Sequence, residues 1–384
     1  MIIIFWICII LIIFVYCGYP IVLLLITKMS SSKSLQTFEA LPRVTMLIAA
    51  YNEEEVIGKK LENCLNLDYP NDLFRVFIVS DGSTDSTDKI VSDFSLRHNN
   101  IKLISSSRIG KAQVINKAMK LIDSELVIFS DANTEYDKNA VKEIVKHFSD
   151  KKIGCVCGRL IYRNPGLIVS GKGENFYWRY ETNLKILESK IGYVAGANGA
   201  IYAIRHKLFE PLPKETINDD FTISMDIVRR GFKCIYEERA FAFEDVAPTV
   251  IGEFQRHVRD GAGHYIALKH LLGLLNPFCG IRSFIYWSHR ILRWLVPGIL
   301  LLLFLINIIL AGQDLYKYIL FMQILFYVFA LLGVLMVGHK KMPFVIYIPF
   351  YFCNLNLALF MGFLKAVSGK QNSMWERTER LVVD

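Results

Sequence analysis

The stretch LVIFSDANTEYD, residues 126–137, is the segment around which the rest of the chain is organised. Five apolar or small residues bounded by polar ones are typical of a buried strand, so Asp131 is expected where that strand ends. Ligands of open α/β sheets bind outside the carboxyl ends of the strands. Asp131 and Asn133 place two hard oxygen donors on one side of the chain, which suits Mg²⁺ or Mn²⁺ carrying a diphosphate. The simpler alternative is an Asp that caps the following helix.

Composition divides the 384-residue chain into a globular middle and apolar ends. Hydrophobic residues make up 53% of the sequence, and the mean hydropathy of +0.33 is high for a soluble protein. The excess lies in residues 1–26 and in three stretches beyond Trp294, while the middle has an ordinary composition. We therefore expect one globular domain attached to membrane segments.

The first 26 residues carry no charge and are long enough to cross a bilayer. They lack a basic start and a small-residue cleavage site, so we expect a retained anchor and not a signal peptide. Lys28, Lys33 and Arg43 follow directly, and the positive-inside rule then places the central domain in the cytoplasm. The expected location is the plasma or inner membrane, with several passes through it.

Charge and cysteine content exclude two other classes. The net charge of +8 is not arranged as a basic stripe interleaved with aromatics, so we expect lipid headgroups and an anionic substrate as partners, and no nucleic acid. The eight cysteines fit no zinc spacing. Cys155 and Cys157 alternate along one predicted strand, which favours reduced thiols packed in a core.

Apolar runs and amphipathic helices alternate through the middle of the chain. Runs begin at Val44, Phe74 and Ile101, and a helical face with Ile57 and Leu61 separates the first two. Repeated βα units imply a mostly parallel sheet with helices on both faces. The expected fold class is therefore α/β, Rossmann-like, with additional transmembrane and interfacial helices.

Polar residues follow each predicted strand, and parallel strands end at one edge of a sheet. Tyr51 can stack on a base, Asp81 can accept a hydrogen bond from a base imide or ribose hydroxyl, and Lys111 can meet phosphate. This is a nucleotide site in outline, although residues 81–85 alone also fit a turn that caps a helix. The candidate nucleotide-binding residues are Ala50, Tyr51, Glu53, Asp81, Lys111, Asp131 and Ala132.

Four segments in this order and spacing resemble the family 2 glycosyltransferases of the GT-A fold: AAYNEEEVI (49–57), SDGSTDST (80–87), GKAQVINKAM (110–119) and SDANTEYD (130–137). The resemblance extends from about Val44 to Gly263. It implies transfer from a nucleotide-diphosphate sugar, usually UDP, with inversion at the anomeric carbon. It also implies that Asp81 contacts uracil and that Asp131 is the first metal-binding Asp. Asn133 departs from the pattern, since many relatives have a second Asp there.

The second half of the domain is expected to hold the acceptor and the base. A glycine-flanked turn at residues 196–200, with Asn198 and Gly199, lets a substrate approach the backbone, although a structural hairpin explains it equally well. Asp219 and Asp220 open a predicted helix, where carboxylates can also act as caps. Inverting transfer needs one base that takes the proton of the acceptor hydroxyl. Asp220 resembles that base in the family.

A predicted helix near residue 256 carries two arginines three residues apart. Arg256 and Arg259 can reach one anion, such as a leaving diphosphate, or can face lipid headgroups. Cellulose, chitin and hyaluronan synthases have Gln-x-x-Arg-Trp here, with the Trp beneath the acceptor sugar. This chain keeps Gln255 but has Val258 and Arg259 at the other two positions. Polymer extension and a single addition therefore both remain open.

The C-terminal third is expected to return to the bilayer. Four full spans would place the tail outside, whereas Lys365 and later basic residues favour the cytoplasm. A re-entrant last segment, with Pro349, Asn354 and Asn356, would resolve this conflict. The expected parts are a transmembrane helix (1–27), a GT-A domain (41–264), interfacial helices (265–293), about three membrane segments (294–364) and a basic tail (365–384).

The sequence thus predicts a membrane-bound inverting glycosyltransferase, with Mg²⁺ or Mn²⁺, that extends a cell-surface polysaccharide from a UDP-sugar. Resemblance to poly-N-acetylglucosamine, hyaluronan and cellulose synthases supports the polymer. One alternative is transfer of a single sugar to a polyprenyl phosphate or other lipid. Another is a non-catalytic subunit for glycan assembly or export, possibly with an export partner, which Asn133 and the missing Trp favour and the intact acidic residues oppose.

Overall fold

The computed structural model describes residues 1–28, 40–163, 169–245, 250–337, 342–369, 371 and 374. Within these residues the strands form one eight-stranded sheet, with the order β3-β2-β1-β4-β7-β6-β8-β5. The strands are β1 Val44–Ala50, β2 Phe74–Asp81, β3 Ile101–Ser106, β4 Leu126–Asp131, β5 Glu135–Tyr136, β6 Ile153–Arg163, β7 Tyr202–Arg205 and β8 Lys233–Asp245. The helices of the domain are α3 Glu54–Leu65, α4 Thr87–Arg97, α5 Lys111–Met119, α6 Ala140–Val145, α7 Val169–Ile191, α8 Asp219–Arg229 and α9 Val250–Leu268.

The first four strands are parallel, as predicted, and this brings their carboxyl ends to one edge. Ala49 pairs with Asp131, and Ala50 pairs with Ser80, the residue before Asp81. β7 then runs antiparallel to both β4 and β6, while β6 and β8 are parallel. β5 also pairs antiparallel with β8. The Rossmann-like, mostly parallel α/β class is confirmed, with antiparallel pairing at β7 and β5.

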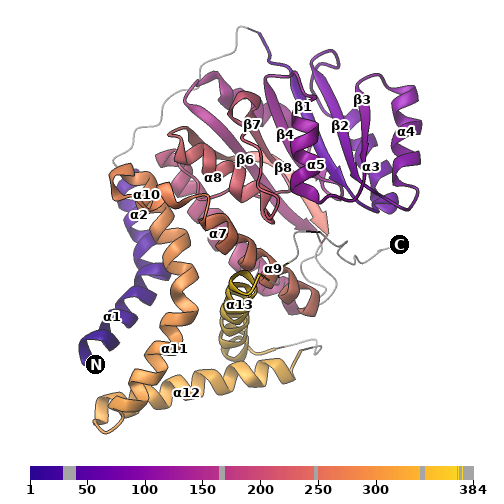
Figure 1. The fold of residues 1–384 in the computed structure, drawn as a ribbon. Coiled ribbons are helices and arrows are strands. Elements are labelled where there is room, and N and C mark those ends of the chain that lie inside the picture. The colour runs from indigo at the N-terminus through magenta and orange to yellow at the C-terminus, as the bar shows by residue number, and fades with distance from the viewer. Residues whose placement is uncertain are drawn as a thin grey trace.

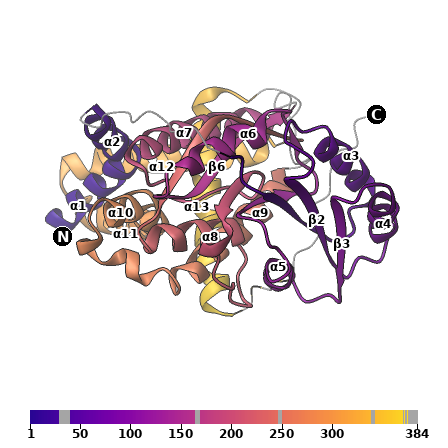
Figure 2. The same ribbon diagram turned by 90° about the horizontal axis from the view of Figure 1, so that it is seen from above.

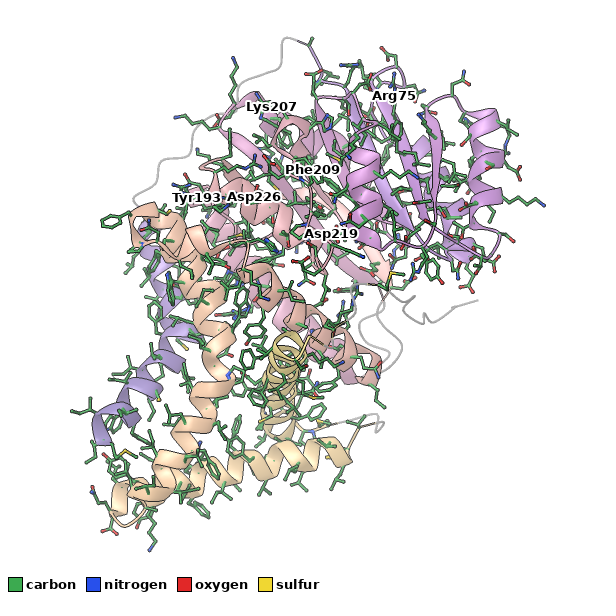
Figure 3. The ribbon with its side chains drawn as sticks, in the orientation of Figure 1. Arg75, Tyr193, Lys207, Phe209, Asp219 and Asp226 are labelled. Atoms are coloured by element: carbon green, nitrogen blue, oxygen red, sulfur yellow. The ribbon has the colours of Figure 1, made fainter. Side chains whose placement is uncertain are left out.

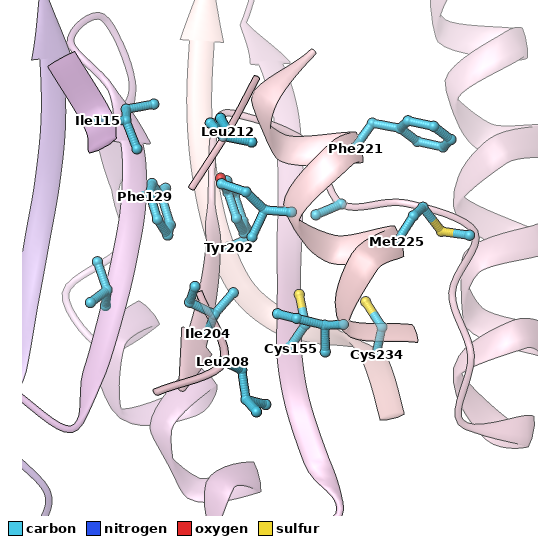
Figure 4. Close-up of a cluster of buried hydrophobic side chains, with 14 of the residues drawn as sticks. Ile115, Phe129, Cys155, Tyr202, Ile204, Leu208, Leu212, Phe221, Met225 and Cys234 are labelled. Carbon is cyan, nitrogen blue, oxygen red and sulfur yellow. The ribbon is translucent and has the colours of Figure 1, made fainter. Parts of the chain in front are cut away.

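Helices cover both faces of the sheet. Seen from above, α5 and α8 lie on one side and α3 and α6 on the other (Figure 2). β1 is buried along its whole length because alternate residues enter two apolar clusters. Figure 4 shows part of the α8-side cluster, where the rings of Phe129 and Tyr202 stack with centroids 4.7 Å apart. Cys155 is a free, fully buried thiol in this cluster, as expected.

Four helical segments among the described residues are long and apolar enough to cross a membrane: Ile2–Lys28, Ile281–Leu310, Asp314–Leu335 and Phe344–Val367. The first combines α1 Ile2–Ile13 with α2 Tyr19–Lys28, and the second combines α10 Ile281–Ile285 with α11 Leu292–Leu310. The second segment includes the stretch from Arg282 that we expected as a separate interfacial helix. Four helices of this kind support membrane association.

The last two helices differ from the expected arrangement. α12 Asp314–Leu335 runs across the end of α11, and α13 Phe344–Val367 returns toward α9 and the domain (Figure 1). α13 continues through Pro349 as one helix and does not reverse. A crosswise α12 brings the chain back toward the domain without a re-entrant segment. Most of the expected basic tail, including Arg377, lies outside the described residues.

Small residues join α13 to α9. A Cβ added at Gly362 would lie 2.7 Å from both Ala262 N and Val258 O, which are backbone atoms that cannot turn aside. We expect Gly362→Val to separate the two helices and lower the thermal stability of the detergent-solubilised protein by several degrees. Gly298→Val in α11 is the matched control, because its Cβ would meet nothing within 4 Å. Equal thermal unfolding of both variants would contradict this packing.

Candidate functional site

Asp81 ends β2 and is fully buried among donors from the loop after β3. Its carboxylate accepts hydrogen bonds from the backbone N–H of Ile109 (2.7 Å) and Gly110 (3.0 Å) and pairs with Arg108 at 2.9 Å. Gly82 has a φ of +71°, and a Cβ there would lie 2.8 Å from Arg108 N, so this close approach requires glycine. The structure thus brings the end of β2 and the loop after β3 into direct contact.

Arg108 also lies over the predicted base-stacking residue. Its guanidinium carbon is 3.2 Å from the centroid of the Tyr51 ring. A base that stacks on Tyr51 must therefore share the ring with Arg108 or displace it. Arg108 was not among the predicted residues, because nothing in the sequence indicates that it turns toward Tyr51.

The other predicted nucleotide-binding residues lie nearby but are buried. Ala50 and Ala132 are 0% and 4% exposed, so any contact they make must come largely from the backbone. Glu53 is also buried, and its N–H donates to Thr87 Oγ1 at 2.8 Å at the start of α4. These three residues support the loops after β1 and β4.

Lys111 links two of the predicted acidic residues. Its Nζ lies 3.2 Å from Asp131 Oδ1, at the end of β4, and 3.2 Å from Asp219 Oδ1, at the start of α8. Burial alone would lower the pKa of Lys111, but the carboxylates of Asp131 and Asp219 outweigh it and raise the pKa. A permanently charged ammonium therefore lies between groups almost ninety residues apart in sequence.

Asp220 and Asp131 both lie close to Gly199. A Cβ at Gly199 would be 3.3 Å from Asp131 Oδ2 and 3.7 Å from Asp220 Oδ2, so a glycine leaves space between these two carboxylates. Burial and the neighbouring Asp219 raise the pKa of Asp220 to about 7. A carboxylate with this pKa changes protonation near neutral pH, as a general base requires.

A small pocket opens where these groups meet. Its floor comes from β1 and β4, and its charged wall comes from α5 and α8. Figure 3 shows Asp219 at the edge of the domain that faces α9. The lining residues are Leu47, Ala49, Lys111, Ile115, Phe129, Ser130, Asp131, Gly199 and Asp219.

Asn133 connects the pocket to β8 and α9. Its Nδ2 donates to Glu244 Oε1 at 2.8 Å, and Glu244 pairs across the sheet with Tyr162. Arg256 on α9 reaches the Tyr162 hydroxyl at 3.3 Å. Arg256 therefore lies on the same side of the sheet as the loop after β4. Glu244 was missed because β8 carries no recognisable motif.

The remaining predicted acceptor-side residues are less close to the acidic groups. Asn198 ties the turn to β6, because its Nδ2 donates to Gly158 O at 3.3 Å and its Oδ1 accepts from Ile201 N at 3.2 Å. On α9, Arg259 is half-buried and Gln255 is exposed. The geometry brings neither of these two into the pocket lining.

The donor set fits a divalent cation that arrives with a diphosphate. No group of three or more His, Cys, Asp or Glu side chains is placed to hold a metal within the described part of the chain. Mg²⁺ and Mn²⁺, however, need only one or two protein oxygens when phosphates and water supply the others. Asp131, with 34% of its side chain exposed, could supply one such oxygen, and the amide of Asn133, two residues on, could supply another.

A buried lysine supports this loop from behind. Lys60 on α3 is 3% exposed, and its Nζ donates to Ser130 Oγ and to Thr134 O, both at 2.7 Å. Lys60 could have been identified from the sequence, because it occupies the same helical face as Ile57 and Leu61. Its ammonium therefore fixes both ends of the segment that contains Asp131.

Burial lowers the pKa of Lys60 to about 8, below its value in an unfolded chain. The unfolded state then binds more protons between about pH 8 and 10.4, so stability rises with pH across this window. We expect the melting temperature of the wild type, relative to Lys60→Met, to increase from pH 8 to 10. A constant difference between the two proteins would show that Lys60 keeps an ordinary pKa.

An open α/β sheet of the GT-A type thus gathers at its strand ends a buried Asp (Asp81), a Lys–Asp pair (Lys111 and Asp131) and a carboxylate with a near-neutral pKa (Asp220). Residues 45–211 match the family model for Glycosyl transferase family 2. The chain therefore carries a family 2 glycosyltransferase domain over these residues.

Curated relatives match a little over half of the chain. The chain is 26% identical to the beta-monoglucosyldiacylglycerol synthase of Nostoc sp. over 205 residues, which are 51% of this chain and 44% of the relative. It is 26% identical to the poly-beta-1,6-N-acetyl-D-glucosamine synthase of Staphylococcus epidermidis over 231 residues, which are 59% of this chain and 56% of the relative. The match spans about half the length of these relatives.

A solved structure covers nearly the whole chain. The mannosyltransferase PcManGT from Pyrobaculum calidifontis, in complex with GDP-Man and Mn2+, has a TM-score of 0.69. Its sequence identity is 21%, and the match covers 96% of this chain and 99% of that one. The GT-A fold prediction is confirmed by this likeness.

Proposed function

We propose that this protein is an inverting glycosyltransferase that moves a sugar from a UDP-sugar to a growing cell-surface polysaccharide at the cytoplasmic face of the membrane. The observation that carries the proposal is that Lys111 pairs with both Asp131 and Asp219 in one pocket, while Asp220 lies beside Gly199 at its edge. These groups can hold a diphosphate and a base on opposite sides of one sugar carbon.

Asp220 is the proposed base. The acceptor hydroxyl gives its proton to the Asp220 carboxylate as its oxygen attacks the anomeric carbon. The sugar–phosphate bond breaks, and the nucleoside diphosphate leaves on the opposite side. Lys111 is placed to meet the charge that develops on that diphosphate. A divalent cation at Asp131, when bound, supplies further charge neutralisation there.

The direction of the membrane helices supports a cytoplasmic domain. Lys28 ends α2 where the chain enters the domain, and the positive-inside rule puts this end in the cytoplasm. α13 returns to α9, so Lys365 in its last turn lies on the same side as Lys28 (Figure 1). Both basic ends then face the cytoplasm, with Met1 outside.

One observation favours a lipid acceptor as the second candidate. α9, which carries Arg256, packs directly on α13, and a Cβ at Gly261 would lie 3.3 Å from Leu359. α9, which carries the predicted acceptor-side residues, therefore borders the apolar helices. A lipid held along α13 would present its phosphate or hydroxyl near α9. One relative is named as a glycolipid synthase and another as a polysaccharide synthase, which supports both acceptor classes.

One experiment tests the donor and the acceptor together. Membranes containing the full-length chain are incubated with a panel of radiolabelled UDP- and GDP-sugars, with Mg²⁺ or Mn²⁺, and the product is sized. High-mass, water-soluble product from a UDP-sugar supports the polysaccharide. A single organic-extractable product supports the lipid acceptor. Incorporation from a GDP-sugar alone would refute the UDP assignment, and no incorporation from any donor would refute the proposed function.

A further inference from the structure

A buried ionic cluster, called here the anchor cluster, lies where α2, α7 and the start of α11 meet. The His289 ring is 1% exposed and lies between two glutamates of α7, with Nδ1 2.6 Å from Glu188 Oε1 and Nε2 3.2 Å from Glu181 Oε2. Tyr19 donates its hydroxyl to Glu188 at 2.6 Å, and Arg293 pairs with Glu181. Burial opposes ionisation, but Arg293 and His289 hold the pKa of Glu181 well below its usual range.

Two π-helical turns lead into the anchor cluster. They are Phe14–Gly18, directly before Tyr19, and Tyr286–Ile291, which contains His289 and Arg290. A π turn contains one extra residue, so it rotates the following side chains relative to a regular helix, and such turns are frequent at functional sites. Here both rotations bring polar side chains of membrane helices toward α7.

Glu188 of the cluster and the neighbouring Arg290 bind the backbone on either side of the Ala195 Cα. The Ala195 N–H donates to Glu188 Oε2 at 2.9 Å, and the Ala195 carbonyl accepts from Arg290 Nε at 2.6 Å. Ala195 begins the loop 195–199, and its last residue, Gly199, lies against Asp131 and the proposed base. Only four residues therefore separate the membrane-helix contacts from the reacting groups.

Arg290 also contacts the helix that carries the base. Its guanidinium carbon is 5.4 Å from the centroid of Phe221, the residue after Asp220. A Cβ at Gly196 would lie 3.3 Å from Arg290 Nη2 and 2.6 Å from Phe221 Cδ2. The same arginine thus packs against both the loop 195–199 and α8. Its displacement would move both.

We propose that Arg290 and the Glu188–His289 pair are positioning residues for sugar transfer. Through them, the membrane helices hold the loop 195–199 and Asp220 in the correct positions relative to each other. The proposal rests on the transferase function stated above. A displacement of about 1 Å among reacting groups can lower a rate about 10²-fold without changing substrate contacts elsewhere. The nucleotide contacts at Asp81 and Tyr51 belong to other elements and are unaffected.

The test compares variants of the full-length chain in lipid nanodiscs. Arg290→Met is expected to lower kcat for transfer at least ten-fold, with the donor KM and the Kd for UDP within two-fold of wild type. Arg290→Lys can still donate to the Ala195 carbonyl, so it should recover most of that kcat. Arg282→Met is the matched control, because Arg282 donates to Val228 O at 3.0 Å at the other end of α8. Its kcat should stay within two-fold of wild type.

Three results would overturn the proposal: wild-type kcat in Arg290→Met, no recovery in Arg290→Lys, or an equal loss in Arg282→Met. If Arg290→Met does not fold, as judged by loss of UDP binding, Glu188→Gln decides instead. Glutamine has the same shape as glutamate but only one oxygen, whereas Glu188 uses one oxygen for Tyr19 and His289 and the other for Ala195 N–H. The kcat of this variant should therefore fall while UDP still binds. A wild-type kcat refutes the proposal. Failure of the proposed function is distinct, since wild type itself would then transfer no sugar.

Discussion

Replacing Asp220 with Asn should lower the rate of sugar transfer by about 10²- to 10⁴-fold, the range expected for loss of a general base. The Kd for UDP should stay within two-fold, because the Asp81 and Tyr51 region does not depend on this carboxylate. In the wild type, kcat/KM should rise with pH through about 7, where Asp220 loses its proton. Single-turnover rates from pH 5.5 to 8.5 provide the measurement. The fall in rate below about pH 7 should be absent in Asp220→Asn.

The same substitution should stabilise the protein at alkaline pH. The pKa of Asp220 is about 7 in the folded state and about 3.9 in an unfolded chain, so the folded state binds the extra proton between these values. This stability is fully present below about pH 4 and is lost as pH rises through 7. Asn carries no charge to bury, so its melting temperature should exceed that of wild type above pH 7 and approach it at pH 5.

Asp226→Asn is the matched control for both readouts. Asp226 lies on the same helix, but its carboxylate pairs with Arg229 at 2.7 Å and Arg230 at 2.9 Å, away from the pocket. It should transfer sugar at the wild-type rate and gain no stability at high pH. Activity retained in Asp220→Asn would remove Asp220 as the base and leave Asp219 as the remaining candidate.

Local sequence patterns predicted which strand ends contribute to this site, because parallel strands end at one edge of a sheet. Asp81 and Asp131 end apolar runs that the periodicity identifies, and the βα order predicts that these strand ends share one edge. The pairing of β4 with β1 itself was not predicted. The nearness of Asp219 to Lys111 was not predictable in this way. It depends on β7 running antiparallel beside β4, which carries α8 across the edge of the sheet.

Other parts of the site had no local signal at all. Arg108 over Tyr51, Glu244 beside Asn133 and His289 between two glutamates each join elements that no periodicity relates. Such contacts are set by tertiary packing and not by propensity. Lys60 differs, because a lysine within the apolar face of a predicted helix already requires a buried partner.

Removal of the Asp131 carboxylate is expected to have the second largest effect. Asp131→Asn keeps the size and shape of the side chain but removes a negatively charged oxygen and one ion-pair partner of Lys111. We expect transfer to fall about 10²-fold or more. In the wild type, Mn²⁺ should tighten UDP binding, and in Asp131→Asn this enhancement should be lost. Titration of UDP with and without Mn²⁺, followed by Mn²⁺ spin resonance, separates cation loss from nucleotide loss.

Asn133→Asp tests the same site by adding a carboxylate where Asp131→Asn removes one. The Asn133 amide donates to Glu244 Oε1 at 2.8 Å, so an Asp there would face a like charge at hydrogen-bonding distance. Repulsion should lower the melting temperature of the cation-free variant. Because Mn²⁺ binds only the folded state, its addition should raise the melting temperature, and this increase should be larger for Asn133→Asp than for wild type. If Mn²⁺ stabilises Asn133→Asp no more than wild type, residue 133 does not face the cation and Asp131 holds it without this neighbour.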